Sequence, residues 1–150
     1  MTHLTPNFTL EEFTVSETAA RKGIPNMPLA GSREYMNLVR TAEVLEKVRI
    51  LLDDKPVLLS SGYRSPGVNA AVGGSKNSAH MSGLAADFIC PDFGTPLQVC
   101  KKLEPFMRDL GIDQLIYEFG TWVHLGLHFG SAPRHQMMTI DTKGVRNGFA

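Results

Sequence analysis

Apolar residues recur with the period of an α-helix in the stretch between Ser32 and Asp54. The positions that share one face of this helix are Leu38, Ala42, Leu45, Val48 and Leu52. Most charged residues of the same stretch fall on its other faces. Ser32 is a suitable N-cap, and Pro56 prevents the helix from continuing. The pattern therefore predicts one long amphipathic helix that packs on a core.

Shorter apolar runs follow this helix and predict strands at 57–61, 85–89, 114–119 and 122–128, with an edge strand at 136–141. Gly120 and Thr121 separate the third run from the fourth, as a tight hairpin turn does. Thr95 is the expected cap of a second helix, which reaches Gly111 with a bend at Pro105. The expected fold is α+β, with a small antiparallel sheet flanked by helices.

Residues 1–31 lack a long periodic segment and are expected to form an arm of short helices packed on the body. Thr9 and Glu12 have the spacing of a capping box. Ser16 is suited to cap a second short helix that Gly23 would end. Residues 32–150 then make one domain, and 150 residues with 43% hydrophobic side chains suffice for a single core.

The charge balance excludes a broad electrostatic surface for nucleic acid or anionic membranes, because 15 basic and 15 acidic residues cancel. No apolar stretch reaches the roughly 20 residues of a membrane span. The N-terminus lacks the pattern of a secretory signal, so we expect cytoplasmic synthesis, no stable membrane insertion and a monomer. Cys90 and Cys100 are expected to be buried free thiols, with a disulfide between them as the alternative.

Three residues have the types and spacing of a metal site, namely His80, Asp87 and His124. Catalytic zinc commonly takes three protein ligands and leaves the fourth position for water. Spacing alone leaves open that both histidines are structural and that the aspartate is a cap or a solvated charge. His128 lies roughly 13 Å from His124 along a strand, which is too far for one ion, so we expect it at the rim.

These residues fall within segments that resemble a known family. SGYRS at 61–65, SAHMSGLAAD at 78–87 and WVH at 122–124 resemble the D-Ala-D-Ala carboxypeptidase-like zinc metallopeptidases, whose fold is shared with the hedgehog signalling domain. The similarity extends from about residue 8 to residue 128. It implies that His80, Asp87 and His124 bind Zn²⁺, that Arg64 contacts the substrate peptide, and that Ser78 forms hydrogen bonds near the metal or substrate. A surface salt bridge is the alternative role for Arg64.

The general base departs from the family pattern. Relatives place an acidic residue three positions before the last histidine ligand, where this chain has Thr121. Glu118 is the nearest acidic residue, and a hairpin turn would return it beside the ligand, so we expect Glu118 to be the base. A structural carboxylate or impaired catalysis are the alternatives. Trp122 stands where some relatives have a histidine, and we expect it to form a wall of the substrate pocket.

The resemblance implies zinc-dependent hydrolysis of peptide bonds in peptidoglycan stem peptides. Both a D-Ala-D-Ala carboxypeptidase and an L-Ala-D-Glu-type endopeptidase fit, and the sequence leaves the cleaved bond open. Small forms of this kind resemble phage-type lysis enzymes (endolysins), which act on the cell wall after release. The alternative function is a zinc-containing cell-wall-binding or structural module with little hydrolytic activity. Nucleic-acid binding has only scattered basic residues in its favour.

Overall fold

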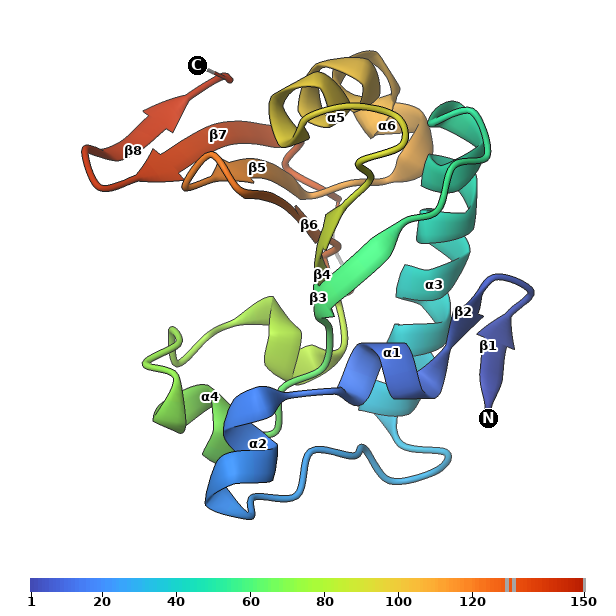
Figure 1. Ribbon diagram of the computed structural model, residues 1–150, viewed down its shortest axis with the longest axis vertical. Coiled ribbons are helices and arrows are strands. Elements are labelled where there is room, and N and C mark those ends of the chain that lie inside the picture. The colour runs from blue at the N-terminus through green and yellow to red at the C-terminus, as the bar shows by residue number, and fades with distance from the viewer. Residues whose placement is uncertain (129, 131, 150) are drawn as a thin grey trace.

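A six-stranded sheet with the order β3-β4-β6-β5-β7-β8 forms the centre of the molecule in the computed structural model, which describes residues 1–128, 130 and 132–149 (Figure 1). Its strands are β3 (Leu58–Ser61), β4 (Ala85–Ile89), β5 (Gln114–Glu118), β6 (Trp122–Gly126), β7 (Gln136–Asp141) and β8 (Gly144–Asn147). Neighbouring strands are antiparallel except β5 and β7, which are parallel. The predicted α+β class is confirmed.

The two longest helices lie on the same face of this sheet, where their apolar residues share one core with the strands (Figure 1). The long predicted helix is α3 (Arg33–Leu51), and the bent second helix is divided into α5 (Pro96–Leu103), η2 (Glu104–Phe106) and α6 (Met107–Leu110). The shorter helices are α1 (Leu10–Thr14), α2 (Glu17–Lys22), α4 (Pro66–Ala71) and η1 (Ala79–Ser82). In the described part of the chain no helix combines the length and the apolar character that crossing a membrane requires.

The predicted caps form as the sequence indicates. Ser32 Oγ accepts a hydrogen bond from the backbone N–H of Tyr35, and Thr9 and Glu12 form a reciprocal capping box. Gly23 ends α2 in the left-handed conformation, with φ of 64°. Both cysteines are buried and free, which confirms the prediction of core thiols.

The arm has more structure than the sequence predicted, because its first residues form a hairpin of β1 (His3–Thr5) and β2 (Phe8–Thr9). These strands are too short to produce a detectable alternation of apolar and polar residues. Phe8 and Phe13 are buried in the same core as α3. The arm is thus packed on the body, although the division into 1–31 and 32–150 remains a prediction, and Ala150 lies outside the described residues.

Three details of the sheet differ from the prediction. The β5–β6 loop is 119–121 rather than a two-residue turn, with Phe119 and Gly120 at positive φ of 52° and 66°. β6 ends at Gly126, because the chain then leaves the sheet to cross over to the far side of β5. The segment predicted as a polar tail instead forms β8, so β7 is not an edge strand. Val145 is the one large apolar residue of β8 and it is exposed, so this strand has no apolar alternation to predict it.

Two buried polar residues of α3 hold the turn that joins η1 to β4. Asn37 Nδ2 donates a hydrogen bond to the Ser82 carbonyl at 2.9 Å, and Thr41 Oγ1 lies 2.7 Å from the Gly83 carbonyl. Gly83 has φ of +75°, and a Cβ there would lie 2.5 Å from the Glu34 carbonyl oxygen. The core helix therefore fixes the segment between the first two predicted metal ligands.

Replacing Thr41 by valine tests this attachment. The side chain is fully buried, and valine keeps its shape while leaving the Gly83 carbonyl without this partner. We expect Thr41→Val to lower the free energy of unfolding by about 1–3 kcal/mol in urea titrations. Thr142→Val, at an exposed position, is the control, and an equal change in both variants would contradict the role of Thr41.

Candidate metal centre

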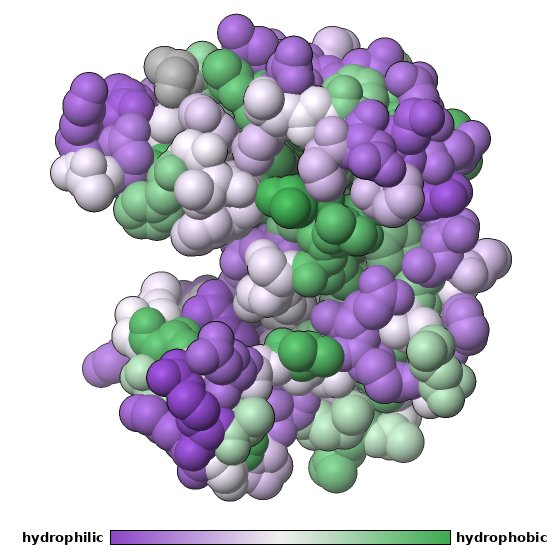
Figure 2. Space-filling view, viewed as in Figure 1, coloured by the Kyte–Doolittle hydropathy of each residue, from purple (hydrophilic) through white to green (hydrophobic). Residues whose placement is uncertain are grey.

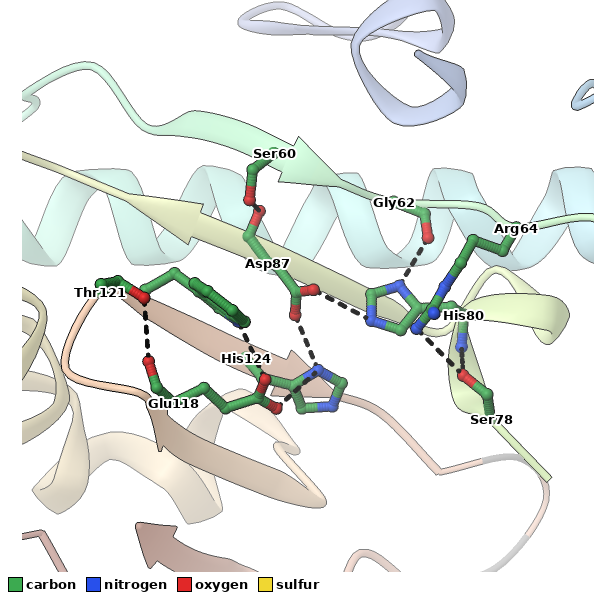
Figure 3. A network of polar contacts seen from close by, with 10 residues as sticks. Ser60, Gly62, Arg64, Ser78, His80, Asp87, Glu118, Thr121 and His124 are labelled. Atoms are coloured by element: carbon green, nitrogen blue, oxygen red, sulfur yellow. Dashed lines mark hydrogen bonds and ion pairs between the residues drawn. The ribbon is translucent and has the colours of Figure 1, made fainter. Parts of the chain in front are cut away.

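The three predicted ligands come from three elements that meet on one face of the sheet (Figure 3). Asp87 on β4 pairs directly with His124 on β6, so both side chains project from the same face. His80 lies in η1, where the bond from Leu84 N to the Ala79 carbonyl folds the chain back toward β4. The register of the β4–β6 pair and the η1 turn together bring the three side chains to one point.

The ligand atoms are close enough to share one ion. His80 Nε2 lies 3.4 Å from Asp87 Oδ2, and His124 Nδ1 lies 2.9 Å from Asp87 Oδ1. All three ligand atoms fall within 4.8 Å of one another. Tetrahedral zinc with ligands at 2.0–2.1 Å places neighbouring ligand atoms about 3.3 Å apart. The donor set of two imidazole nitrogens and one carboxylate therefore fits Zn²⁺.

The tautomer of His80 also suits metal binding. His80 Nδ1 lies 2.7 Å from the Gly62 carbonyl oxygen, which can only accept, so Nδ1 carries the proton. When the ring is neutral, Nε2 is the nitrogen with a lone pair for a metal ion, and it is this atom that lies nearest Asp87. Such a bond from the second ring nitrogen to a carbonyl orients histidine ligands in metal proteins.

Asp87 is ionised in this arrangement. Burial alone would raise the pKa of its carboxyl group, but hydrogen bonds and charge from His124 and His80 hold that pKa well below its usual range. A carboxylate must be deprotonated to bind a metal ion. The site therefore holds its acidic ligand in the form that binding requires.

Gly62 joins the arm to the metal centre. A Cβ at this position would lie 2.7 Å from the Phe13 carbonyl oxygen and 2.8 Å from Phe13 Cα, which leaves no room for a side chain. Tyr63 N donates to the same Phe13 oxygen at 2.7 Å. The α1 helix thus packs directly against the backbone whose carbonyl orients His80, a contact that no sequence motif indicated.

Arg64 and Ser78 form a second layer of contacts beside the ligands. Ser78 Oγ accepts hydrogen bonds from His80 N at 3.3 Å and from Arg64 Nη2 at 3.5 Å. Burial lowers the pKa of Arg64, while the charges of Asp87 and Glu118 raise it in part, and guanidinium stays charged in proteins. Arg64 Nε is buried and without a hydrogen-bond partner among the described residues.

The loop 73–78 that carries Ser78 is held by Asn69, which the sequence did not single out. Asn69 Nδ2 donates to the Ser75 carbonyl at 2.9 Å, and its own carbonyl accepts from Gly74 N at 2.9 Å. A Cβ at Gly74 would lie 2.1 Å from Asn69 Oδ1 and 3.1 Å from Arg64 Nη1. The adjacent glycines of this loop were the available signal, because they mark a close approach of backbone to neighbouring groups.

Glu118 reaches the ligands from β5. It pairs directly with Trp122 across the hairpin, and His124 follows two residues later on the same face, so Glu118 and His124 are diagonal neighbours. Glu118 Oε1 lies 4.0 Å from His124 Nδ1. Burial raises the pKa of Glu118, as does the charge of Asp87, whereas the histidines and Trp122 lower it in part. Thr121 instead lies exposed in the loop, and its hydroxyl contacts the Glu118 carbonyl.

The ligands form the floor of a cleft of about 640 Å³. Figure 2 shows the hollow entering from the left of the view, between the β7–β8 side of the molecule and the α2–α4 side. The side chains named above that line it are His80, Asp87, His124, Arg64, Ser78 and Glu118. His128 also lines the cleft. Trp122 is not among the described residues of the lining, and its ring instead lies 5.6 Å from that of Phe119.

Comparisons with known proteins agree with this geometry. The family model described as Peptidase M15 matches residues 6–126. A curated protein named "Zinc D-Ala-D-Ala carboxypeptidase", from Streptomyces albus G, is 43% identical over 51 residues, which cover 34% of this chain and 20% of that protein. The chain therefore matches about a fifth of the length of this relative.

Another wall of the cleft depends on the pair of Asp113 and Arg134. Arg134 donates to Asp113 Oδ1 from its backbone N at 2.7 Å and to Oδ2 from Nη2 at 2.7 Å. Burial would raise the pKa of Asp113, but the bonds from Arg134 outweigh it, and the net effect is a lowered pKa. A carboxyl group with a lowered pKa stabilises the fold above its unfolded pKa, and this contribution is lost as pH falls through the folded value.

We expect Asp113→Asn to lower the free energy of unfolding by about 1–3 kcal/mol at neutral pH. The difference from the wild type should narrow as pH falls below about 4, where the wild-type carboxyl group also becomes protonated. Urea titrations at several pH values measure this difference. Asp92→Asn, at an exposed position, is the control, and a pH-independent difference for Asp113→Asn would contradict the ionic role.

Gly62→Ala should weaken metal binding, because an added methyl group would displace either Phe13 or the carbonyl that orients His80. We expect the zinc affinity to fall roughly 10–100-fold, the usual effect of losing a group that orients a ligand. Competition with a chromophoric chelator measures it. In the control Gly67→Ala the methyl group meets only the Ile24 side chain. Unchanged affinity in folded Gly62→Ala would exclude this role.

Proposed function

Because the chain belongs to the M15 family of peptidases, we propose that it hydrolyses peptide bonds in the stem peptides of peptidoglycan. Zinc metallopeptidase chemistry follows from the family and from the donor set of two histidines and one aspartate. The similarity to the zinc D-Ala-D-Ala carboxypeptidase of Streptomyces albus G supports the choice of substrate. The observation that carries the proposal is the convergence of three ligand atoms within 4.8 Å on the floor of a cleft.

We assign His80, Asp87 and His124 as the zinc ligands. Zinc bound by such ligands supplies a Lewis acid and a water of lowered pKa. Glu118 is assigned as the general base, since its Oε1 atom faces the ligands and is 4.0 Å from His124 Nδ1. It accepts the proton of the attacking water and delivers it to the leaving amine.

Arg64 is assigned to substrate binding and to charge stabilisation. Glu118 and Arg64 flank the ligands in Figure 3, so a peptide lying over the ligands would meet the base on one side and the guanidinium on the other. The guanidinium donates to a substrate carboxylate or to the oxyanion that develops during attack. Ser78 supports this role because its hydroxyl contacts both Arg64 and the backbone N–H of His80.

A second candidate is a zinc-containing module that binds cell-wall peptides with little hydrolysis. Thr121 at the position of the expected acid favours it. Glu118, which reaches the same ligands from β5, favours hydrolysis. Zinc-dependent binding of muropeptides without turnover would select the binding module.

The test is hydrolysis of purified muropeptides by the zinc-loaded protein, followed by mass spectrometry of the products. We expect new amino termini or free D-alanine, and loss of activity after zinc is removed with a chelator. Glu118→Gln should retain zinc and lose roughly 10²–10⁴-fold in kcat, the usual contribution of a general base. Glu43→Gln, at an exposed position on α3, is the matched control.

Absence of products from the zinc-loaded wild type would overturn the proposed function, and undiminished activity of Glu118→Gln would overturn the assignment of the base. The masses of the products decide between a carboxypeptidase and an endopeptidase. Synthesis in the cytoplasm followed by action on the cell wall, as in endolysins, stays a prediction. Fractionation of producing cells and their lysates tests it.

A further inference from the structure

Trp122 makes a hydrogen bond to the proposed base that no sequence pattern indicated. Its indole Nε1 donates to Glu118 Oε2 at 3.0 Å. We propose that Trp122 is the positioning residue of Glu118. Because Trp122 is the single tryptophan of the chain, its fluorescence also reports whether this bond is formed. The catalytic part of this proposal rests on the assignment of Glu118 as the general base.

The bond distinguishes the two oxygens of the carboxylate. An indole N–H is a donor without acceptor capacity. Oε2 is therefore held as the acceptor of this hydrogen bond. Oε1 is then directed toward His124 Nδ1, at 4.0 Å. A glutamate side chain has three rotatable bonds and loses their freedom when it is ordered. Trp122 therefore holds one oxygen in place and leaves the other to accept a proton.

Trp122 is itself held by the hairpin. Its backbone pairs directly with Glu118 across β5 and β6. Its ring packs on Phe119 with 5.6 Å between ring centres. Phe119 is fixed in turn by the bond from its backbone N to the Ile140 carbonyl at 2.7 Å. The loop 119–121 and strand β7 thus set the direction of the indole N–H.

Two simpler roles for Trp122, a core residue and a wall of the pocket, do not account for its contacts. A core residue would be fully buried, yet Trp122 is only partly buried and does not belong to the hydrophobic core of the described chain. A pocket wall would face the cleft, yet Trp122 is absent from the described lining. The bond to Glu118 and the contact with Phe119 remain the specific interactions of its side chain.

The first test is Trp122→Phe, which keeps an aromatic ring and removes the N–H donor. We expect kcat to fall roughly tenfold with KM and zinc content unchanged, a smaller loss than removal of a general base causes. In the Glu118→Gln background the same substitution should change kcat little, because the two residues act as one unit. A raised KM with unchanged kcat would overturn the proposal in favour of a pocket wall, and unchanged kinetics would overturn it outright.

The second test is the fluorescence of Trp122, which needs no substrate. We expect a shifted emission maximum in zinc-loaded Glu118→Ala and no shift in Glu43→Ala, because Glu118 is the residue of the described chain that accepts a hydrogen bond from the indole N–H. Phe119→Leu, which keeps the bond and loses the ring contact, should lower kcat less than Trp122→Phe. An unchanged emission in Glu118→Ala would overturn the bond itself.

The two tests separate this proposal from the proposed function. If the wild type hydrolyses no muropeptide while the emission of Glu118→Ala still shifts, the proposed function fails and the positioning role fails with it, but the hydrogen bond stands. If the wild type is active and Trp122→Phe retains full kcat, the proposed function stands and the positioning role alone is overturned.

Discussion

The contact of one partly buried carboxylate with two buried imidazoles is the interaction on which the site depends. Asp87 Oδ1 and Oδ2 lie 2.9 Å and 3.4 Å from ring nitrogens of His124 and His80. Burying polar groups costs free energy unless they have partners. The fold must therefore hold these three side chains in place against that cost. A divalent cation satisfies all three, and the pairing of β4 with β6 places two of them side by side.

The surrounding chain serves largely to hold this geometry through backbone carbonyls. Gly62 accepts from His80, while Ser82 and Gly83 accept from Asn37 and Thr41 of α3. Glycines at 62 and 83 permit the close approach of α1 and α3 that these bonds require. The arm and the long helix are therefore part of the metal centre, although neither supplies a ligand. Their apolar side chains form the core, and their polar groups make the hydrogen bonds that hold the segments carrying the ligands.

The chemistry available to this cleft follows from its charged groups. Glu118 and Arg64 lie on either side of the ligands (Figure 3), and burial acts on both, raising the pKa of the acid and lowering that of the guanidinium. In the proposed function, Glu118 is the base and Arg64 supplies a positive charge, and the metal ligands between them let the two act on opposite sides of one peptide bond. Trp122 holds Glu118 through a hydrogen bond, and Ser78 accepts a hydrogen bond from Arg64. The zinc peptidase function of the family thus has specific support in residues that are not ligands.

Features of this protein that depend on near neighbours in the chain could be predicted from the sequence. Ser32, the Thr9–Glu12 box and Gly23 act within one turn, so the helix ends were predictable, and the local segment from His80 to Asp87 carried the metal motif. Tertiary structure alone decided how distant segments meet. The hairpin predicted from the sequence brings Glu118 beside His124, but the direction of the Trp122 indole toward Glu118 depends on how the 119–121 loop packs. Packing between segments far apart in the chain leaves no local periodicity in the sequence. Three features arise in this way: the parallel pairing of β5 with β7, the hydrogen bond from Thr41 to the Gly83 carbonyl, and the close approach of Gly62 to Phe13.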